Sequence, residues 1–236
     1  MKRMTNQQNG FTILELTIAT MIFSAIFLTA STALLQMGKL YYKGAVGGRT
    51  QEIARGAMDQ IAQQLQFSSV DSVTAGPKNY VVANGTDVPA GTLDFYAVCI
   101  GGSRYTYRLN AQVVNSVASG TYTAATHKLL HALWHDSVSS GTCVPANLSL
   151  TDPSTTPGAV GANGEEVMDQ RMRLSNFSVS CNTSKVCTLT VGVIYGDDDL
   201  VFFDATGKPT HCETVIGNQW CATSQFSTSV LKRIGN

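Results

Sequence analysis

The chain is short of proline and of charge. Its 236 residues include 6 prolines, and none precedes Pro77, so no proline interrupts a helix in the first third of the chain. Charged side chains make up 14% of the residues, with 16 basic against 16 acidic groups, whereas about a quarter is usual. Because phosphate binding by bulk electrostatics needs an excess of Lys and Arg, the sequence carries no direct nucleic-acid signal.

Motifs that carry enzyme chemistry are also missing. The sequence contains no GxSxG, P-loop, GxGxxG or HExxH pattern, so it offers no nucleophile elbow, phosphate cradle or zinc helix. It has no CxxC, which removes support for a zinc ribbon or a thioredoxin-like redox site. These absences predict a protein that is not an enzyme and uses no cofactor.

A long uncharged run lies near the N-terminus. Lys2 and Arg3 open the chain, Glu15 follows, and the 23 residues from Leu16 to Gly38 carry no ionisable group. A helix of this length reaches roughly 35 Å, which covers a hydrocarbon core of about 30 Å. Its Thr and Ser hydroxyls can bond back to helix carbonyls. Since the basic pair precedes the run, the positive-inside rule predicts a single-pass membrane segment with a cytoplasmic N-terminus.

A secretory signal peptide or a plain signal anchor is the simplest alternative. Signal peptides have an apolar region of about 7 to 15 residues followed by a cleavage site, whereas here the Gly10-Phe11 junction precedes a longer run. Glu15 is also anomalous, because a carboxylate in an apolar segment is costly unless a partner neutralises it. Snorkelling of Glu15 to the membrane interface is the alternative to a partner.

Residues 10–16, Gly-Phe-Thr-Ile-Leu-Glu-Leu, together with the basic leader and the apolar run, resemble the prepilin motif of type IV pilins and type II secretion pseudopilins. The resemblance implies that a prepilin peptidase cuts after Gly10 and methylates the new amino terminus on Phe11. Such cleavage would leave 226 residues with 14 basic and 16 acidic side chains.

The resemblance and the cost of an unpaired membrane charge together give Glu15 a role in filament assembly. Cleavage creates an amine on Phe11 at the edge of the apolar segment, where each charge alone is expensive. The amine of one subunit and the carboxylate of its neighbour meet only if the helices are staggered, so the pair would set the register of a helical polymer. Thr32 stands where major pilins commonly carry Pro, which predicts an unbroken helix and favours a minor pilin.

A second helical pattern follows the apolar run. A glycine-rich patch at Gly44, Gly47 and Gly48 would soften a helix by about 1 kcal/mol per Gly relative to Ala. Between Arg49 and Phe67 an apolar stripe predicts an amphipathic stalk helix covered by a sheet; a partner-binding helix is the alternative. The stripe consists of Ile53, Ala57, Ile61 and Leu65, flanked by Ala54, Met58 and Ala62.

Beyond Pro77, short runs rich in Val, Thr, Tyr and Phe alternate with turn residues and predict strands. The predicted strands are Leu93–Ile100, Arg104–Leu109, Leu129–Trp134, Met172–Ser180, Thr188–Tyr195 and Phe226–Leu231, and Thr151–Glu166 is predicted to be a loop. A long helix packed on an antiparallel sheet predicts an α+β fold, similar to the larger minor pilins and J-type pseudopilins. The predicted parts are a leader (1–10), a transmembrane or filament-core helix (11–38), an amphipathic stalk helix (39–70) and a disulfide-containing β-rich head (71–236).

Six cysteines, all after residue 90, lie in the part predicted to be exported, which favours disulfides over free buried thiols. Fifteen pairings are possible. The preferred pairs are Cys181 with Cys187 across a strand connection, Cys212 with Cys221, and by elimination Cys99 with Cys143.

Two clusters, one of histidines and one of aspartates, contain residue types that can bind a metal ion. His127, His131 and His135 are spaced by four, which allows two of them to share zinc on a helix but sets them about 13 Å apart on a strand. The flanking Thr-, Ser- and Gly-rich stretches favour a strand, so no metal site is predicted. Asp197, Asp198 and Asp199 predict a solvated hairpin turn, with a calcium site as the alternative.

The sequence therefore predicts a structural subunit, a minor pilin rather than a major one. It would be inserted in the cytoplasmic membrane, cut by prepilin peptidase, and assembled with other pilin subunits by a pilus or secretion platform into an extracellular or periplasmic filament. A type II secretion pseudopilin is the nearest alternative. An uncleaved, membrane-anchored adhesin or binding domain is the alternative from another class.

Overall fold

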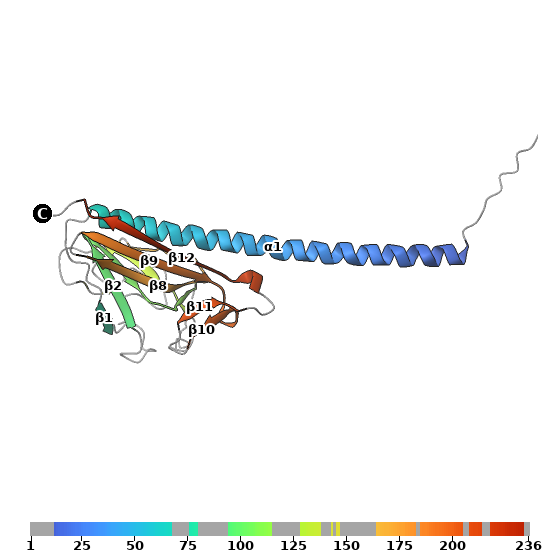
Figure 1. Cartoon of the computed structure of the whole chain (residues 1–236). Helices are drawn as coiled ribbons and strands as arrows, with labels where there is room; N and C mark the ends of the chain where they lie inside the picture. The colour runs from blue at the N-terminus through green and yellow to red at the C-terminus, as the bar shows by residue number, and fades with distance from the viewer. Residues whose placement is uncertain are drawn as a thin grey trace, which may run out of the picture. The chain divides into compact units, whose positions relative to one another are not determined.

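The computed structural model describes residues 12–67, 76–79, 94–114, 128–137, 143, 145–146, 164–182, 185–204, 208–213 and 218–233. The chain divides into two compact units, residues 1–42 and 43–236. One long N-terminal helix is followed by antiparallel sheets (Figure 1), so the predicted α+β class is confirmed.

Helix α1 (Ile13–Phe67) is a single helix of 55 residues. The transmembrane and stalk segments predicted to meet at residues 38 and 39 are therefore one element, and the glycine-rich patch at Gly44, Gly47 and Gly48 does not interrupt it. Propagating a helix through a glycine costs about 1 kcal/mol, whereas ending it requires a new and costly nucleation. Residues 68–70, which the sequence assigns to the stalk, lie outside the described residues.

A three-stranded antiparallel sheet in the order β12-β9-β8 forms one wall of the second unit. It comprises β8 (Met172–Cys181), β9 (Val186–Tyr195) and β12 (Ala222–Leu231), and Figure 1 shows these strands alongside the C-terminal half of α1. The predicted apolar stripe of the helix faces a common core with this sheet. The buried helix residues are Thr50, Ala54, Ala57, Ile61 and Leu65, and Ile53, Met58 and Ala62 are partly buried against them.

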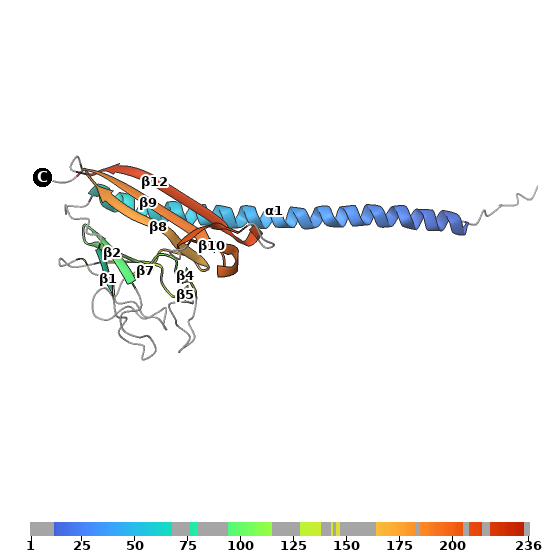
Figure 2. The same ribbon diagram turned by 60° about the horizontal axis from the view of Figure 1, so that its bottom comes forward.

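A five-stranded antiparallel sheet, in the order β1-β2-β3-β6-β7, completes this core. Its strands are β1 (Gly76–Asn79), β2 (Asp94–Ile100), β3 (Ser103–Tyr107), β6 (Leu133–Ser137) and β7 (Glu165–Glu166), and Figure 2 shows the side of the head that carries them. The rings of Tyr107 and Phe177 have their centres 4.5 Å apart and join the two sheets.

Three predicted boundaries in this region are wrong. The single strand expected over Leu129–Trp134 is two strands, β5 (Lys128–Leu129) and β6, because β5 turns away to pair in parallel with β4 (Gln112–Val113). The loop expected up to Glu166 ends in β7, whose two residues pair with β6. Arg104–Leu109 ends earlier, since β3 stops at Tyr107 and Leu109 makes a lone parallel bridge to Leu174.

Strand β8 contains a bulge that the sequence pattern conceals. Its register against β9 shifts between Leu174 and Asn176, which leaves Ser175 without a partner. Leu174 and Phe177 are both buried although they are three residues apart, and strict alternation would put them on opposite faces. The extra residue of the bulge lets Leu174 and Phe177 both face the core, and the side chains after Asn176 alternate as predicted.

A hairpin of β10 (Val201–Phe203) and β11 (Pro209–Cys212) carries a second, smaller core. Its buried members are Ile194, Leu200, Val201 and Cys221. Because Ile194 lies on β9, this core links the hairpin to the three-stranded sheet.

A buried ion pair lies between β3 and β6. Arg104 and Asp136 are directly opposite each other in the register, and their side chains are 5% and 0% exposed. Arg104 Nε donates to Asp136 Oδ1 at 2.8 Å, and Nη2 donates to Oδ2. The two parallel bonds satisfy a carboxylate that would otherwise be very costly to bury.

Candidate functional site

Glu15 lies in the first turn of α1, where it closes a capping box with Thr12. The backbone N–H and the hydroxyl of Thr12 both donate to Glu15 Oε2 at 3.0 Å. In return the Glu15 N–H donates to Thr12 Oγ1 at 3.3 Å. This reciprocal pattern satisfies donors at the helix start, and the negative charge is favoured at that end of the helix dipole.

The capping box also sets the direction of the Glu15 carboxylate. Its side chain turns back toward the start of the helix, and Oε2 is occupied by Thr12, whereas Oε1 has no hydrogen-bond partner among the described residues. Within the described residues, one oxygen is thus held in place and the other has no partner. The Thr-x-x-Glu spacing ahead of an apolar run is a readable signal for such a cap, and the sequence-based prediction did not use it.

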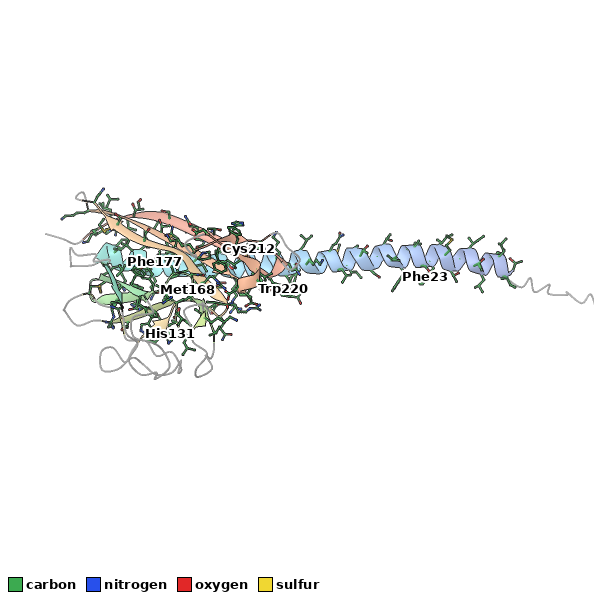
Figure 3. All side chains as sticks on the ribbon, turned by 90° about the horizontal axis from the view of Figure 1, so that it is seen from below. Phe23, His131, Met168, Phe177, Cys212 and Trp220 are labelled. Carbon is green, nitrogen blue, oxygen red and sulfur yellow. A yellow bond between two sulfur atoms is a disulfide. The ribbon has the colours of Figure 1, made fainter. Side chains whose placement is uncertain are left out.

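The apolar part of α1 is exposed along its length in the part of the chain that the structure describes. An 18-residue window has a mean hydropathy of 2.0, none of it is buried, and the helix is long and apolar enough to cross a membrane. Figure 3 shows side chains such as Phe23 projecting outward from this part of the helix. The large exposed side chains include Ile13, Leu14, Leu16, Ile18, Met21, Ile22, Phe23, Ile26, Phe27, Leu28, Leu34 and Leu35.

The hydroxyl groups in this segment are bonded to the helix itself. For example, Thr17 donates to the carbonyl of Leu14 at 2.8 Å and Ser24 to that of Thr20 at 2.7 Å. Thr29, Ser31 and Thr32 do the same. The segment therefore presents an almost wholly apolar surface, which suits lipid or the helices of neighbouring chains.

The two residues of the predicted cleavage junction, Gly10 and Phe11, lie outside the described residues. Cleavage after Gly10 and methylation of Phe11 stay predictions. The first described residue, Thr12, is covalently bonded to Phe11, so an amine created there would lie close along the chain to the Glu15 cap.

Three disulfides form, and they join the same pairs that the sequence favoured. Cys99 is bonded to Cys143, Cys181 to Cys187 and Cys212 to Cys221. The second bond closes the connection between β8 and β9, where its two cysteines are register partners, and the third ties β11 to the start of β12. Each of the three lies in the unit that begins at residue 43.

Loop length predicts how much each disulfide stabilises the head. The bond from Cys99 to Cys143 spans 44 residues and that from Cys181 to Cys187 spans 6. By the chain-entropy relation, replacing the first pair by serine should lower the free energy of unfolding by about 4 kcal/mol and replacing the second by about 2 kcal/mol. Urea unfolding of the two double-serine variants in micelles measures this, and a larger loss at Cys181 and Cys187 would contradict it.

The histidines do not gather as metal ligands. His127 lies outside the described residues, His131 lies in the connection before β6 and His135 lies in β6, so neither described histidine is on the helix that a shared zinc ion would require. His131 Nδ1 is 3.4 Å from Glu166 Oε2 and His135 Nδ1 is 3.6 Å from Glu165 Oε1. In the part of the chain that the structure describes, no three His, Cys, Asp or Glu side chains come together to hold a metal ion.

The aspartates after Gly196 are engaged by arginines. Asp197 pairs with Arg171 and accepts from Gln112 Nε2 at 2.8 Å, and Asp198 is 2.7 Å from the fully buried Arg173. Burial opposes the Asp197 charge, but the hydrogen bonds from Gln112 and Arg171 outweigh it and hold the pKa of this carboxyl below its ordinary value. The predicted hairpin turn is wrong: Asp198–Leu200 forms a short 3-10 helix, η1, and the strands on either side of it, β9 and β10, pair in different sheets. Ion pairs from Arg171 and Arg173 hold Asp197 and Asp198 against the head.

A polar hollow of about 330 Å³ lies beside the bulge in β8. It is lined by residues of β8, β12 and the β10–β11 hairpin and by Leu109, which follows β3; the lining residues are Leu109, Ser175, Asn176, Asp204, Lys208, Pro209, Thr210 and Gln225. A Cβ on Gly192 would lie 2.6 Å from Ser175 Oγ, so the bulge packs only against a glycine. The sequence-based prediction missed this hollow, although a glycine inside a strand signals a bulge or a close approach.

Comparison with known proteins adds no relative. No protein-family model matches the chain, no curated protein matches it, and no solved structure matches it. What the molecule does has to be inferred from its own residues: a bare apolar helix with one acid at its start, attached to a disulfide-bonded head.

Proposed function

We propose that this chain is a structural subunit, a minor pilin, of a type IV pilus-like filament. It would be processed by prepilin peptidase and assembled through its N-terminal helix. One observation carries the proposal: the uncharged part of α1 has no buried residue in its most apolar window, and Glu15 stands as an acid at its start with one oxygen open. A plain signal anchor would require the apolar surface, but the Glu15 carboxylate would contribute nothing to anchoring.

The exposed apolar surface supports a change of surroundings between membrane and filament. Lipid covers such a helix before assembly, and the helices of neighbouring subunits cover it afterwards. Burial of apolar surface contributes little between these two states, because both surroundings are apolar. An ion pair would then determine which subunits are neighbours and how far their helices are shifted along the filament axis. Glu15 supplies the carboxylate of this pair, and the amine on Phe11 of the adjacent subunit supplies the other charge.

The mature N-terminus tests the processing step. We expect intact-mass analysis of the protein recovered from its native host to show a chain that begins with methylated Phe11 and lacks residues 1–10. A Gly10→Val substitution should prevent the cut, because a branched side chain replaces the glycine at the junction, whereas Asn9→Ala should leave it unchanged. An intact chain beginning at Met1 in the native protein would favour the uncleaved, membrane-anchored adhesin.

A pseudopilin of a type II secretion system shares the same helix, and the described residues favour neither reading over the other. The two alternatives differ in the location of the filament, which is extracellular for a pilus and periplasmic for a secretion system. Detection of the processed subunit in fibres sheared from the cell surface supports the pilus, whereas its retention in the periplasm supports the secretion system. In both cases Glu15 and the apolar helix act in the same way.

A further inference from the structure

Three cross-strand rows on the outward face of the β12-β9-β8 sheet carry hydroxyls and amides and no charged side chain, whereas the next row along this face holds the buried Arg173 beside Ile194. The three rows are Ser180, Thr188 and Ser229; Ser178, Thr190 and Ser227; and Asn176, Gly192 and Gln225. Most of these side chains are exposed, and Thr190 and Ser227 hydroxyls are 3.1 Å apart. None of these nine positions is charged, in a chain of which 14% of the residues are charged.

The polar hollow stands at one end of this face. The third row supplies Asn176 and Gln225 to it, and the β10–β11 hairpin closes its far side. Leu109 and Pro209 add apolar surface to the lining. Its charged side chains are Asp204 and Lys208, and the backbone N–H of Lys208 donates to Asp204 Oδ1 at 2.9 Å.

The side chains on this face and in the hollow favour some classes of ligand over others. Nucleic acids, phosphorylated groups and acidic peptides need cationic side chains, and Lys208 is the one cationic residue among those that line the hollow. Hydroxyl and amide side chains both donate and accept, which matches a ligand whose own surface is made of hydroxyls. A hollow of about 330 Å³ is at the small end of ligand sites, which run from about 300 to 1,000 Å³.

We propose that this hollow binds a neutral saccharide, with one or two sugar rings in the hollow and the rest of the chain lying along the hydroxyl rows. Asn176 and Gln225 would hydrogen-bond the ring hydroxyls, and Leu109 and Pro209 would contact the apolar face of a ring. The proposal does not depend on filament assembly, because every lining residue belongs to the unit that begins at residue 43.

Calorimetric titration of the full chain tests this inference. The protein is held in a detergent without a sugar headgroup, such as a dimethylamine oxide, because alkyl maltosides would compete. The probes are maltotetraose, cellotetraose and chitotetraose, with tetragalacturonate and the oligonucleotide dT12 as charged comparisons. We expect at least one neutral probe to bind with a Kd of about 1 mM or lower and neither charged probe to bind.

Variants identify the site. The double substitution Asn176→Ala with Gln225→Ala should weaken binding by about 10-fold or more, since two neutral hydrogen bonds are lost. Gln63→Ala, at an exposed glutamine on α1, is the matched control and should leave the Kd unchanged. Equal urea midpoints for the variants and the parent establish that the head is folded. Failure of all three neutral probes, binding by the charged probes alone, or neutral binding that survives the double substitution would each overturn the proposal.

Discussion

Glu15→Gln is expected to reduce incorporation of the subunit into filaments by more than 100-fold. Glutamine keeps the side-chain length and an oxygen that can accept from Thr12, so the capping box survives. The charge is lost, and in the proposed filament the amine of the neighbouring subunit would be left unpaired in an apolar setting at a cost of about 3–5 kcal/mol, which corresponds to roughly two to four orders of magnitude in the assembly equilibrium. Quantitative immunoblotting of sheared fibres against whole cells measures the ratio.

Thr12→Val is the matched control for this experiment. It removes the hydroxyl that Glu15 bonds while leaving the carboxylate charged. Loss of a capping side chain costs about 1 kcal/mol, so incorporation should fall by no more than several-fold. If Glu15→Gln assembles as well as the parent and Thr12→Val does not, Glu15 is a helix cap and its proposed pairing role is wrong.

Asp136→Ala is expected to be the most destabilising single substitution that we consider in the head. It leaves the Arg104 guanidinium, whose side chain is 5% exposed, without its carboxylate between β3 and β6. Breaking one side of a buried pair costs about 3–5 kcal/mol. Urea unfolding in micelles, followed by tryptophan fluorescence, measures the loss.

The pair of Arg49 and Asp169 provides the control, because it has the same chemistry at 59% and 37% side-chain exposure. Asp169→Ala should cost at most about 1 kcal/mol. The double substitution Arg104→Met with Asp136→Leu removes both charges and should recover most of the stability lost in Asp136→Ala. Equal losses for Asp136→Ala and Asp169→Ala would contradict the burial argument.

The elements with a strong periodic signal could be predicted from the sequence. The four-residue repeat of Ala57, Ile61 and Leu65 identified the buried face of α1, and the alternation after Asn176 identified the outward face of β8. The strand order predicted one disulfide, since Cys181 and Cys187 flank a short connection, whereas the pair of Cys99 and Cys143 was reached by elimination.

Elements fixed by tertiary pairing could not be predicted in this way. Strands β4, β5 and β7 have two residues each, too few for any periodicity, and their partners are distant in the sequence. The bulge at Ser175 shifts the alternation by one residue, so Leu174 and Phe177 read as opposite faces. The polar hollow depends on that bulge and on a hairpin some 30 residues away, which explains why no linear motif marks it.

The candidate assembly site also has some features that the sequence predicts and others that only the structure shows. The absence of charge between Leu16 and Gly38 and the position of Glu15 are properties of the sequence, and the structure shows the corresponding bare helix. The orientation of the Glu15 carboxylate toward Thr12 depends on side-chain geometry. Only the structure shows that Oε2 accepts the hydrogen bonds from Thr12 and that Oε1 has no partner among the described residues.

A structure of this subunit within its assembled filament is the most direct test of the account. We predict that the free oxygen of the Glu15 carboxylate lies within about 4 Å of the methylated amine on Phe11 of an adjacent subunit, the distance of an ion pair. A Glu15 side chain that faces solvent or lipid, bonded only to its own Thr12 and far from every neighbouring amino terminus, would contradict it.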